Sequence, residues 1–150
     1  MGLEAAGRWA AGVVDQHVDL AELGRFDIEQ AADPLERLAH HALRGEVWDK
    51  AVVYLRTAGA KAMAHSANRD AITYFEHALG ALERLPESRE TLEQAVDLRF
   101  DLRNAFFAVG ELGRIFDNLQ QAQVLAERLQ DQRRLGWVAA YMCHYFWRIG

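Results

Sequence analysis

The segment Ser66-Ala-Asn-Arg-Asp-Ala-Ile-Thr-Tyr-Phe-Glu-His-Ala-Leu79 decides the fold of this chain. Ala71, Phe75 and Ala78 follow one another at steps of four and three, so they share one face of a helix. Small residues at such positions let two helix axes approach closely, and one large side chain fills the gap between the axes. Gly59 supplies another small position twelve residues before Ala71. The pattern predicts two helices that cross at short distance.

A second, divergent copy of this pattern lies 44 residues further along the chain. Ile115 replaces the small residue of the first copy, and Arg103 stands where the first copy has Gly59. A similar pattern at Ala51, Leu55 and Ala58 lies only 20 residues before the first copy. This spacing is the length of one helix and not of one repeat, so the sequence does not decide which of the first helices pair with each other. The aligned positions of the two copies are Ser66 and Gly110, Ala71 and Ile115, Phe75 and Leu119, and Ala78 and Ala122.

A third copy begins near the end of the sequence. Phe106-Phe-Ala-Val-Gly110 is matched 40 residues later by Phe146-Trp-Arg-Ile-Gly150, but the second helix of this copy is missing. Apolar side chains cover nearly the whole circumference of this last helix, and such a helix must be buried on more than one side. We therefore expect it to continue into a longer solenoid or to be covered by another copy of the chain. The side chains expected at this edge are Trp137, Tyr141, Tyr145, Phe146 and Trp147.

The recurring small and aromatic positions resemble the signature of the tetratricopeptide-repeat family. The resemblance implies an all-α fold, in which antiparallel helical hairpins stack into a right-handed solenoid over residues 33–150. Segments 35–43, 51–59 and 74–79 are also similar to the repeat regions of bacterial regulators that carry an AAA ATPase and a class III adenylate/guanylate cyclase domain. That similarity implies a sensor or assembly arm of a signalling protein. It carries over no catalytic residue.

Periodicity and breaks predict six or seven helices and no strand. Residues 1–32 form an N-terminal region with a first helix over 3–22, and the repeats occupy 33–150. Every break in the second region is short, so neighbouring helices must pack antiparallel. Asp33 and Asn68 are the expected N-caps of two helices. The first helix expected in the repeat region begins at Pro34 and ends at Gly45, and another follows the Asn68 cap and ends before Pro86. The other expected helices cover roughly 48–65, 88–109, 113–129 and 132–150.

Composition excludes several classes of function. The net charge of −5 without a basic stripe argues against nucleic-acid binding, and no apolar run reaches the length of a membrane span. Cys143 is the single cysteine, so no intrachain disulfide can form, which fits the cytoplasm. Its place in an apolar run predicts a buried, inert thiol.

No constellation for catalysis, a cofactor or a metal is evident. Glu36 and His40 lie one helical turn apart and could supply two metal ligands, although a surface pair is the favoured interpretation. Glu93, Asp97 and Asp101 line one side of a helix at steps of four. We interpret them as a solvated, charge-balanced face, and the wall of a binding groove is the alternative.

Binding to a protein or peptide is the function that the architecture favours, because the first helices of stacked hairpins line an extended surface. Tyrosine, tryptophan and arginine are typical anchors at such surfaces, although Tyr54 could equally belong to the core. A small-ligand sensor that regulates an attached ATPase or cyclase is the alternative function. The candidate partner-binding residues are Trp48, Tyr54, Arg56, Lys61, Arg99, Arg103 and Asn104.

Overall fold

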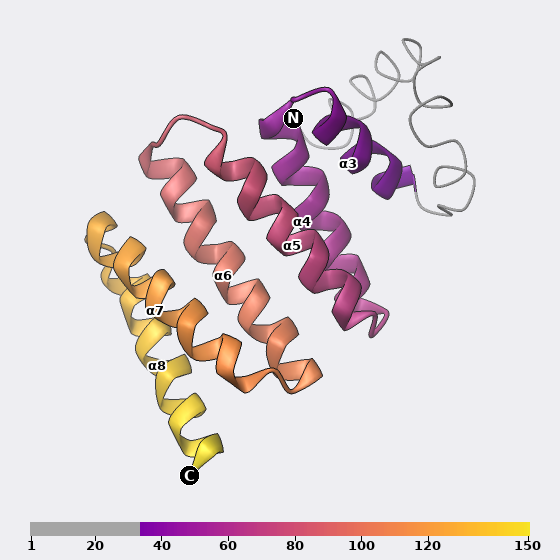
Figure 1. Cartoon of the computed structure of the whole chain (residues 1–150). Coiled ribbons are helices and arrows are strands. Elements are labelled where there is room, and N and C mark those ends of the chain that lie inside the picture. Colours follow the sequence, from indigo (N-terminus) through magenta and orange to yellow (C-terminus); the bar gives the residue numbers. More distant parts are fainter. Residues whose placement is uncertain (1–33) are drawn as a thin grey trace.

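The computed structural model of the chain describes residues 34–150, which contain six α-helices and no strand (Figure 1). The all-α prediction is therefore confirmed for this part of the chain, whereas the expected first helix and the Asp33 cap lie outside the described residues. None of the described helices is long and apolar enough to cross a membrane. The helices are α3 (Pro34–Arg44), α4 (Trp48–Ala64), α5 (Asn68–Glu83), α6 (Arg89–Val109), α7 (Leu112–Leu129) and α8 (Gln132–Ile149).

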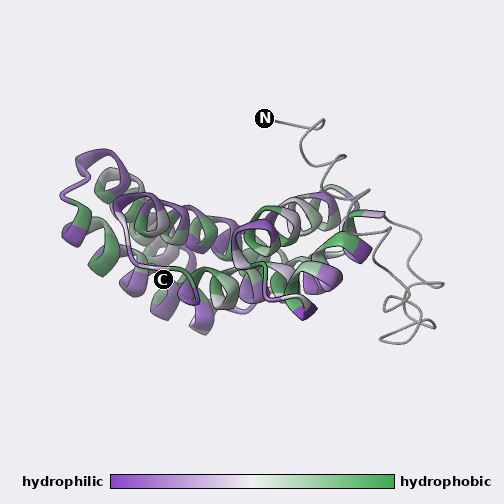
Figure 2. Cartoon of the chain, turned by 90° about the horizontal axis from the view of Figure 1, so that it is seen from above, coloured by the Kyte–Doolittle hydropathy of each residue, from purple (hydrophilic) through white to green (hydrophobic). Residues whose placement is uncertain are grey.

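Each helix packs chiefly on the helices that precede and follow it in the sequence. The most extensive contacts join α4 to α5 and α6 to α7, and α4 also touches α6. In Figure 1, α4 and α8 are partly hidden behind α5 and α7. Seen from above in Figure 2, the described helices form an elongated, bowed array. Helix α6 is therefore flanked by helices on both sides.

Four of the five connections between the described helices are the same tight turn. In each, one residue takes a left-handed backbone conformation, and the amide of the next residue donates to the carbonyl five positions earlier. This is the Schellman arrangement, which satisfies carbonyls left without partners at a helix end. The next helix begins at once. The left-handed residues are Glu46 (φ 56°), Ser66 (φ 60°), Gly110 (φ 79°) and Gln130 (φ 54°).

The connection between α5 and α6 is different. Here Ser88 caps α6, with its hydroxyl accepting from the Thr91 amide at 3.1 Å and the Thr91 hydroxyl accepting from the Ser88 amide at 2.8 Å. Such a capping box fixes the start of a long helix. By contrast, Asn68 does not cap α5 as the sequence predicted. Ala67 occupies that position without a side-chain hydrogen bond, because the turn at Ser66 leads straight into the helix.

The core follows the small and aromatic positions of the repeat. Phe75 is 2% exposed, and its ring packs against Gly59 of the preceding helix. In the second copy, Leu119 fills the equivalent place and is fully buried. Small buried residues surround these large ones and allow α4 to approach α5, and α6 to approach α7. The fully buried small positions are Ala42, Ala51, Ala71, Ala78, Ala105, Ala122 and Ala126.

Candidate interaction surfaces

The carboxylates of α6 tie this helix to its neighbours on both sides. Asp101 accepts a hydrogen bond from Arg56 Nε of α4 at 2.8 Å. Asp97 accepts from Arg134 of α8 through both of its oxygens, at 3.0 Å and 2.8 Å. The paired geometry makes the second bridge the stronger one. Both carboxylates are paired with arginines of other helices, as a charge-balanced row would be, and Asp97 also lines a cavity between α6 and α8.

Arg134 also fixes the start of α8. Asp131 is the N-cap of this helix, and its side chain accepts from the Arg134 amide at 3.0 Å and from the Arg134 guanidinium at 2.6 Å. These hydrogen bonds lower the pKa of Asp131 below its ordinary value. The carboxylates of Asp97 and Asp131 in turn raise the pKa of Arg134. The three side chains form one network that anchors α8 to α6.

Arg103 is also bound within the chain. Its guanidinium lies 4.6 Å from the centre of the Tyr141 ring and 5.1 Å from that of Phe107, and it contacts His144 Nδ1 on α8. Burial lowers the pKa of Arg103. A cation over aromatic rings gains stability when it is partly desolvated. Arg103 therefore holds α6 and α8 together, and a partner would have to displace these contacts to reach it.

The other candidate partner-binding residues do not form one surface. Tyr54 is 4% exposed and lies in the core, where burial raises the pKa of its hydroxyl, so of the two roles left open by the sequence the core role is the one observed. Trp48 is half-buried, with the Arg84 guanidinium 5.5 Å from its ring. Lys61 and Asn104 are exposed. Arg99 points to a different side of the molecule from Arg103.

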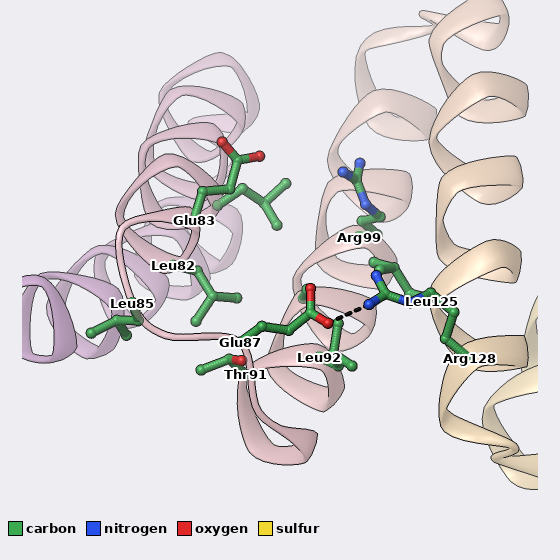
Figure 3. Close-up of a pocket in the computed structure, with 11 residues that line it drawn as sticks. Leu82, Glu83, Leu85, Glu87, Thr91, Leu92, Arg99, Leu125 and Arg128 are labelled. Atoms are coloured by element: carbon green, nitrogen blue, oxygen red, sulfur yellow. Dashed lines mark hydrogen bonds and ion pairs between the residues drawn. The ribbon is translucent and has the colours of Figure 1, made fainter.

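Arg99 lies at the centre of a groove over α6, between α5 and α7. Two adjoining cavities form this groove, and Leu79, Glu83 and Arg99 line both of them. Figure 3 shows one cavity, with Leu82 of α5 on one side and Leu92, Arg99 and Leu125 on the other. Sequence reasoning missed this groove. The available signal was a lone arginine within the apolar stripe of α6, among Leu92, Ala95, Leu102 and Phe106.

Charged side chains surround the groove. An ion pair between Glu76 and Arg114 spans it near the α6–α7 turn, and an ion pair between Glu87 and Arg128 spans it near the α5–α6 loop (Figure 3). Arg99 takes part in neither pair. Its Nη1 donates to Asn118 Oδ1 at 3.3 Å, while its buried Nε has no hydrogen-bond partner in the described structure.

Large apolar side chains of α8 are exposed, with Trp147 on the far side of the helix from Val138 and with Trp137 and Phe146 at its two edges. Trp137, Phe146 and Trp147 are 50%, 53% and 79% exposed, whereas Tyr141 and Tyr145 are half-buried against α6 and α7. Cys143 is exposed as well, so the prediction of a buried thiol is wrong. The reason is that α8 packs through the opposite face, where Val138 is its one buried residue.

Comparison with known proteins adds nothing to this geometry. No family model, curated protein or solved structure matches the chain. Among the described residues, no group of three or more histidine, cysteine, aspartate or glutamate side chains could hold a metal ion. The two notable surfaces of the described residues are the exposed apolar side chains of α8 and the groove centred on Arg99.

Proposed function

We propose that this chain is a protein-interaction scaffold of the tetratricopeptide type, in which hairpins stack as a right-handed solenoid. In this role it serves as the assembly or sensor arm of a larger signalling protein, in line with the resemblance to bacterial cyclase and ATPase regulators. Its partner is a protein or peptide, and the cytoplasm is the compartment that suits its single free cysteine.

The exposed far side of α8 is the observation that carries this proposal. Four large apolar side chains of this one helix are at least half exposed, including Ile149 at 51%. Several large apolar side chains exposed on one helix are typical of interaction sites on folded proteins. Tryptophan is also among the side chains that contribute most to binding energy at interfaces.

The internal repeat indicates what would cover α8. Phe106 of α6 is 3% exposed because α7 follows it, and Arg114 of α7 lies 4.3 Å from its ring centre. Phe146 stands 40 residues later, at the matching position of α8, and is 53% exposed. An amphipathic helix packed there as α7 packs on α6 would bury it. A second copy of this chain is the partner that we propose to test first.

Light scattering after size exclusion tests this function on the full chain. We expect the mass to exceed that of a monomer and to rise with concentration. The double variant Phe146→Glu/Trp147→Glu should remain monomeric, because glutamates are costly to bury without partners. Val53→Glu is the matched control, since Val53 is equally exposed, at 58%, but lies on α4.

The same samples allow a clear negative result. A chain that stays monomeric at every concentration, and that binds no dye for exposed apolar surface, would contradict the proposal. Association that persists in the double variant but is lost with Val53→Glu would place the interface on α4 instead.

A further inference from the structure

The contact between Arg103 and His144 joins the second half of α8 to α6. A guanidinium group has donors and no acceptor, so Arg103 Nη2 donates and His144 Nδ1 accepts. An imidazole can accept at this nitrogen only when it is neutral and carries its proton on Nε2. The contact therefore requires an uncharged His144.

Aromatic rings surround this pair. The imidazole centre lies 5.2 Å from that of the Phe107 ring and 6.3 Å from that of Trp147, on which it stacks. The Arg103 guanidinium lies over the rings of Phe107 and Tyr141. Arg103 and His144 are both half-buried, so solvent screens charges at this place less than at a fully exposed one.

No carboxylate balances the pair. Among residues 34–150, none contacts Arg103 or His144, and Arg103 donates its other hydrogen bond to the uncharged amide of Asn104 at 3.0 Å. On α8 itself, the titratable or charged side chains one turn away from the imidazole are Tyr141 before it and Arg148 after it. Neither of these offers a carboxylate.

The helices packed on α8 supply no anion to His144 in the described structure. The α6 carboxylates Asp97 and Asp101 bond to arginines of α8 and α4 elsewhere along the helix. Helix α7 meets the second half of α8 through the ring of Phe116, and the neighbouring Asp117 lines the groove on the other side of α7. Protonation of His144 would therefore place two cations against each other without an anion to offset them.

A histidine changes its charge between about pH 5 and 8, whereas an arginine stays charged throughout. We propose that His144 makes the docking of the second half of α8 sensitive to pH, and with it the exposed surface that carries Phe146 and Trp147. The hydrogen bond to Arg103 holds this half at the upper end of the range. Towards the lower end the imidazolium and the guanidinium repel each other, and this half of α8 loosens from α6.

The loosening has a consequence for binding. A loosened helix end must be ordered again before it can bind, so its affinity for a partner falls. This regulation of the α8 surface rests on the proposed function, whereas the loosening of α8 does not. The two are therefore tested by separate measurements.

Hydrogen exchange on the full chain tests the loosening. After correction for the intrinsic exchange rate, protection of the α8 amides beyond Val138 should fall about threefold between about pH 7.5 and 5.5. It should stay constant in His144→Asn, because the asparagine Oδ1 can accept from Arg103 in place of Nδ1 and does not titrate. His77→Asn is the matched control, an exposed histidine on α5 that should leave the dependence on pH as it is in the parent chain.

Arg103→Gln supplies the second arm of the exchange measurement. Without the guanidinium, a protonated His144 meets no second cation, so the dependence on pH should disappear as it does in His144→Asn. The double variant should show no further change. Equal dependence on pH in the parent chain and His144→Asn, or dependence that persists in a folded Arg103→Gln, would contradict the proposal. Circular dichroism checks folding, and His144→Asn decides alone if Arg103→Gln does not fold.

Light scattering over the same pH range tests the regulation. The dissociation constant of the self-associated parent chain should rise about threefold towards pH 5.5, and that of His144→Asn should stay unchanged. Association that depends on pH equally in both proteins, or in neither, would overturn the regulation. A chain that never associates would contradict the proposed function instead.

The exchange measurement still decides whether His144 loosens α8 in that case. It is therefore repeated in Phe146→Gln/Trp147→Gln, which should be monomeric. Glutamines replace the glutamates of the earlier variant because a carboxylate beside His144 would attract its protonated form. Protection that falls with pH in this monomer, and not after His144→Asn is added, would support the loosening without any association. Constant protection in both would contradict it.

Discussion

The ring of Phe75 lies directly on the backbone of Gly59, where a Cβ atom would stand 2.4 Å from Cε1 of the ring. We predict that Gly59→Ala destabilises the chain by about 1–3 kcal/mol, because the buried ring cannot move aside without disturbing the core. Urea unfolding measures this change. The matched control is Gly80→Ala, where an added Cβ would meet nothing within 4 Å beyond the backbone of its own helix and alanine should stabilise the helix by about 0.5–1 kcal/mol.

A double variant shows whether the clash is the cause. Gly59→Ala combined with Phe75→Leu should be more stable than the sum of the two single changes predicts, because the smaller side chain relieves the overlap. Strict additivity of the two changes would mean that alanine at this position acts through the helix backbone and not through the ring.

The left-handed residue of the repeated turn between helices predicts a substitution that raises the stability of the chain. Gln130 holds φ at 54° between α7 and α8, a conformation that costs a residue with a Cβ about 1–2 kcal/mol. Gln130→Gly should therefore stabilise the chain by about 0.5–1 kcal/mol after the greater flexibility of glycine in the unfolded state is included. Gly110→Ala, at the equivalent turn, should destabilise by a similar amount. Equal unfolding midpoints for all three proteins would contradict this account.

These turns also show why the positions of the helices could be predicted from sequence more readily than the residues at which the helices end. The apolar steps of three and four place the expected range 48–65 on α4 (Trp48–Ala64) almost residue for residue. The left-handed position is a glutamate, a serine and a glutamine in three of the four repeated turns, and none of these residues signals that conformation. Asn68 looked like a cap because asparagine favours that position, but the preceding turn had already fixed the helix start.

The direction of single side chains was harder still to predict. Arg99 and Arg103 lie one turn apart on α6, and sequence placed both on one binding face. In the structure Arg99 borders a groove between α5 and α7, whereas Arg103 stacks on rings of α6 and α8. A difference of about 40° around the helix separates the two directions. Which neighbour each meets depends on packing between helices, and periodicity along one helix does not contain that information.

The bridge between Asp97 and Arg134 predicts a specific effect on α8. Arg134→Lys removes the fork that contacts both oxygens of Asp97, because lysine carries a single ammonium group. We expect a loss of about 1–2 kcal/mol and faster hydrogen exchange of the α8 amides. Arg133→Lys is the control. The Arg133 side chain is exposed, so this substitution should change the stability by less than about 0.5 kcal/mol. Unchanged exchange in Arg134→Lys would show that apolar packing alone holds α8.

The N-cap of α8 gives a pH-dependent prediction. The pKa of Asp131 is lowered in the folded chain by hydrogen bonds from Arg134, so the ionised carboxylate favours the folded state. This contribution is complete above the ordinary aspartate pKa of about 3.9 and is lost as the pH falls through the lower folded value. Asp131→Asn keeps a capping side chain without the charge. It should be less stable than the parent chain near neutral pH, and the difference should shrink below about pH 4. A difference that is constant across this range would exclude the carboxylate charge as its cause.

The exposed thiol of Cys143 reports whether the far side of α8 is covered. Cys143 and Trp147 lie four residues apart, so they share one face of the helix. Thiol reactivity depends on access to the sulfur, so a disulfide reagent should label Cys143 quickly in a monomer and slowly when another chain packs on this face. We therefore expect labelling of the parent chain to slow as its concentration rises, while Phe146→Glu/Trp147→Glu labels at one fast rate throughout. Equal rates for both proteins at every concentration, with full labelling after denaturation, would mean that self-association does not cover α8.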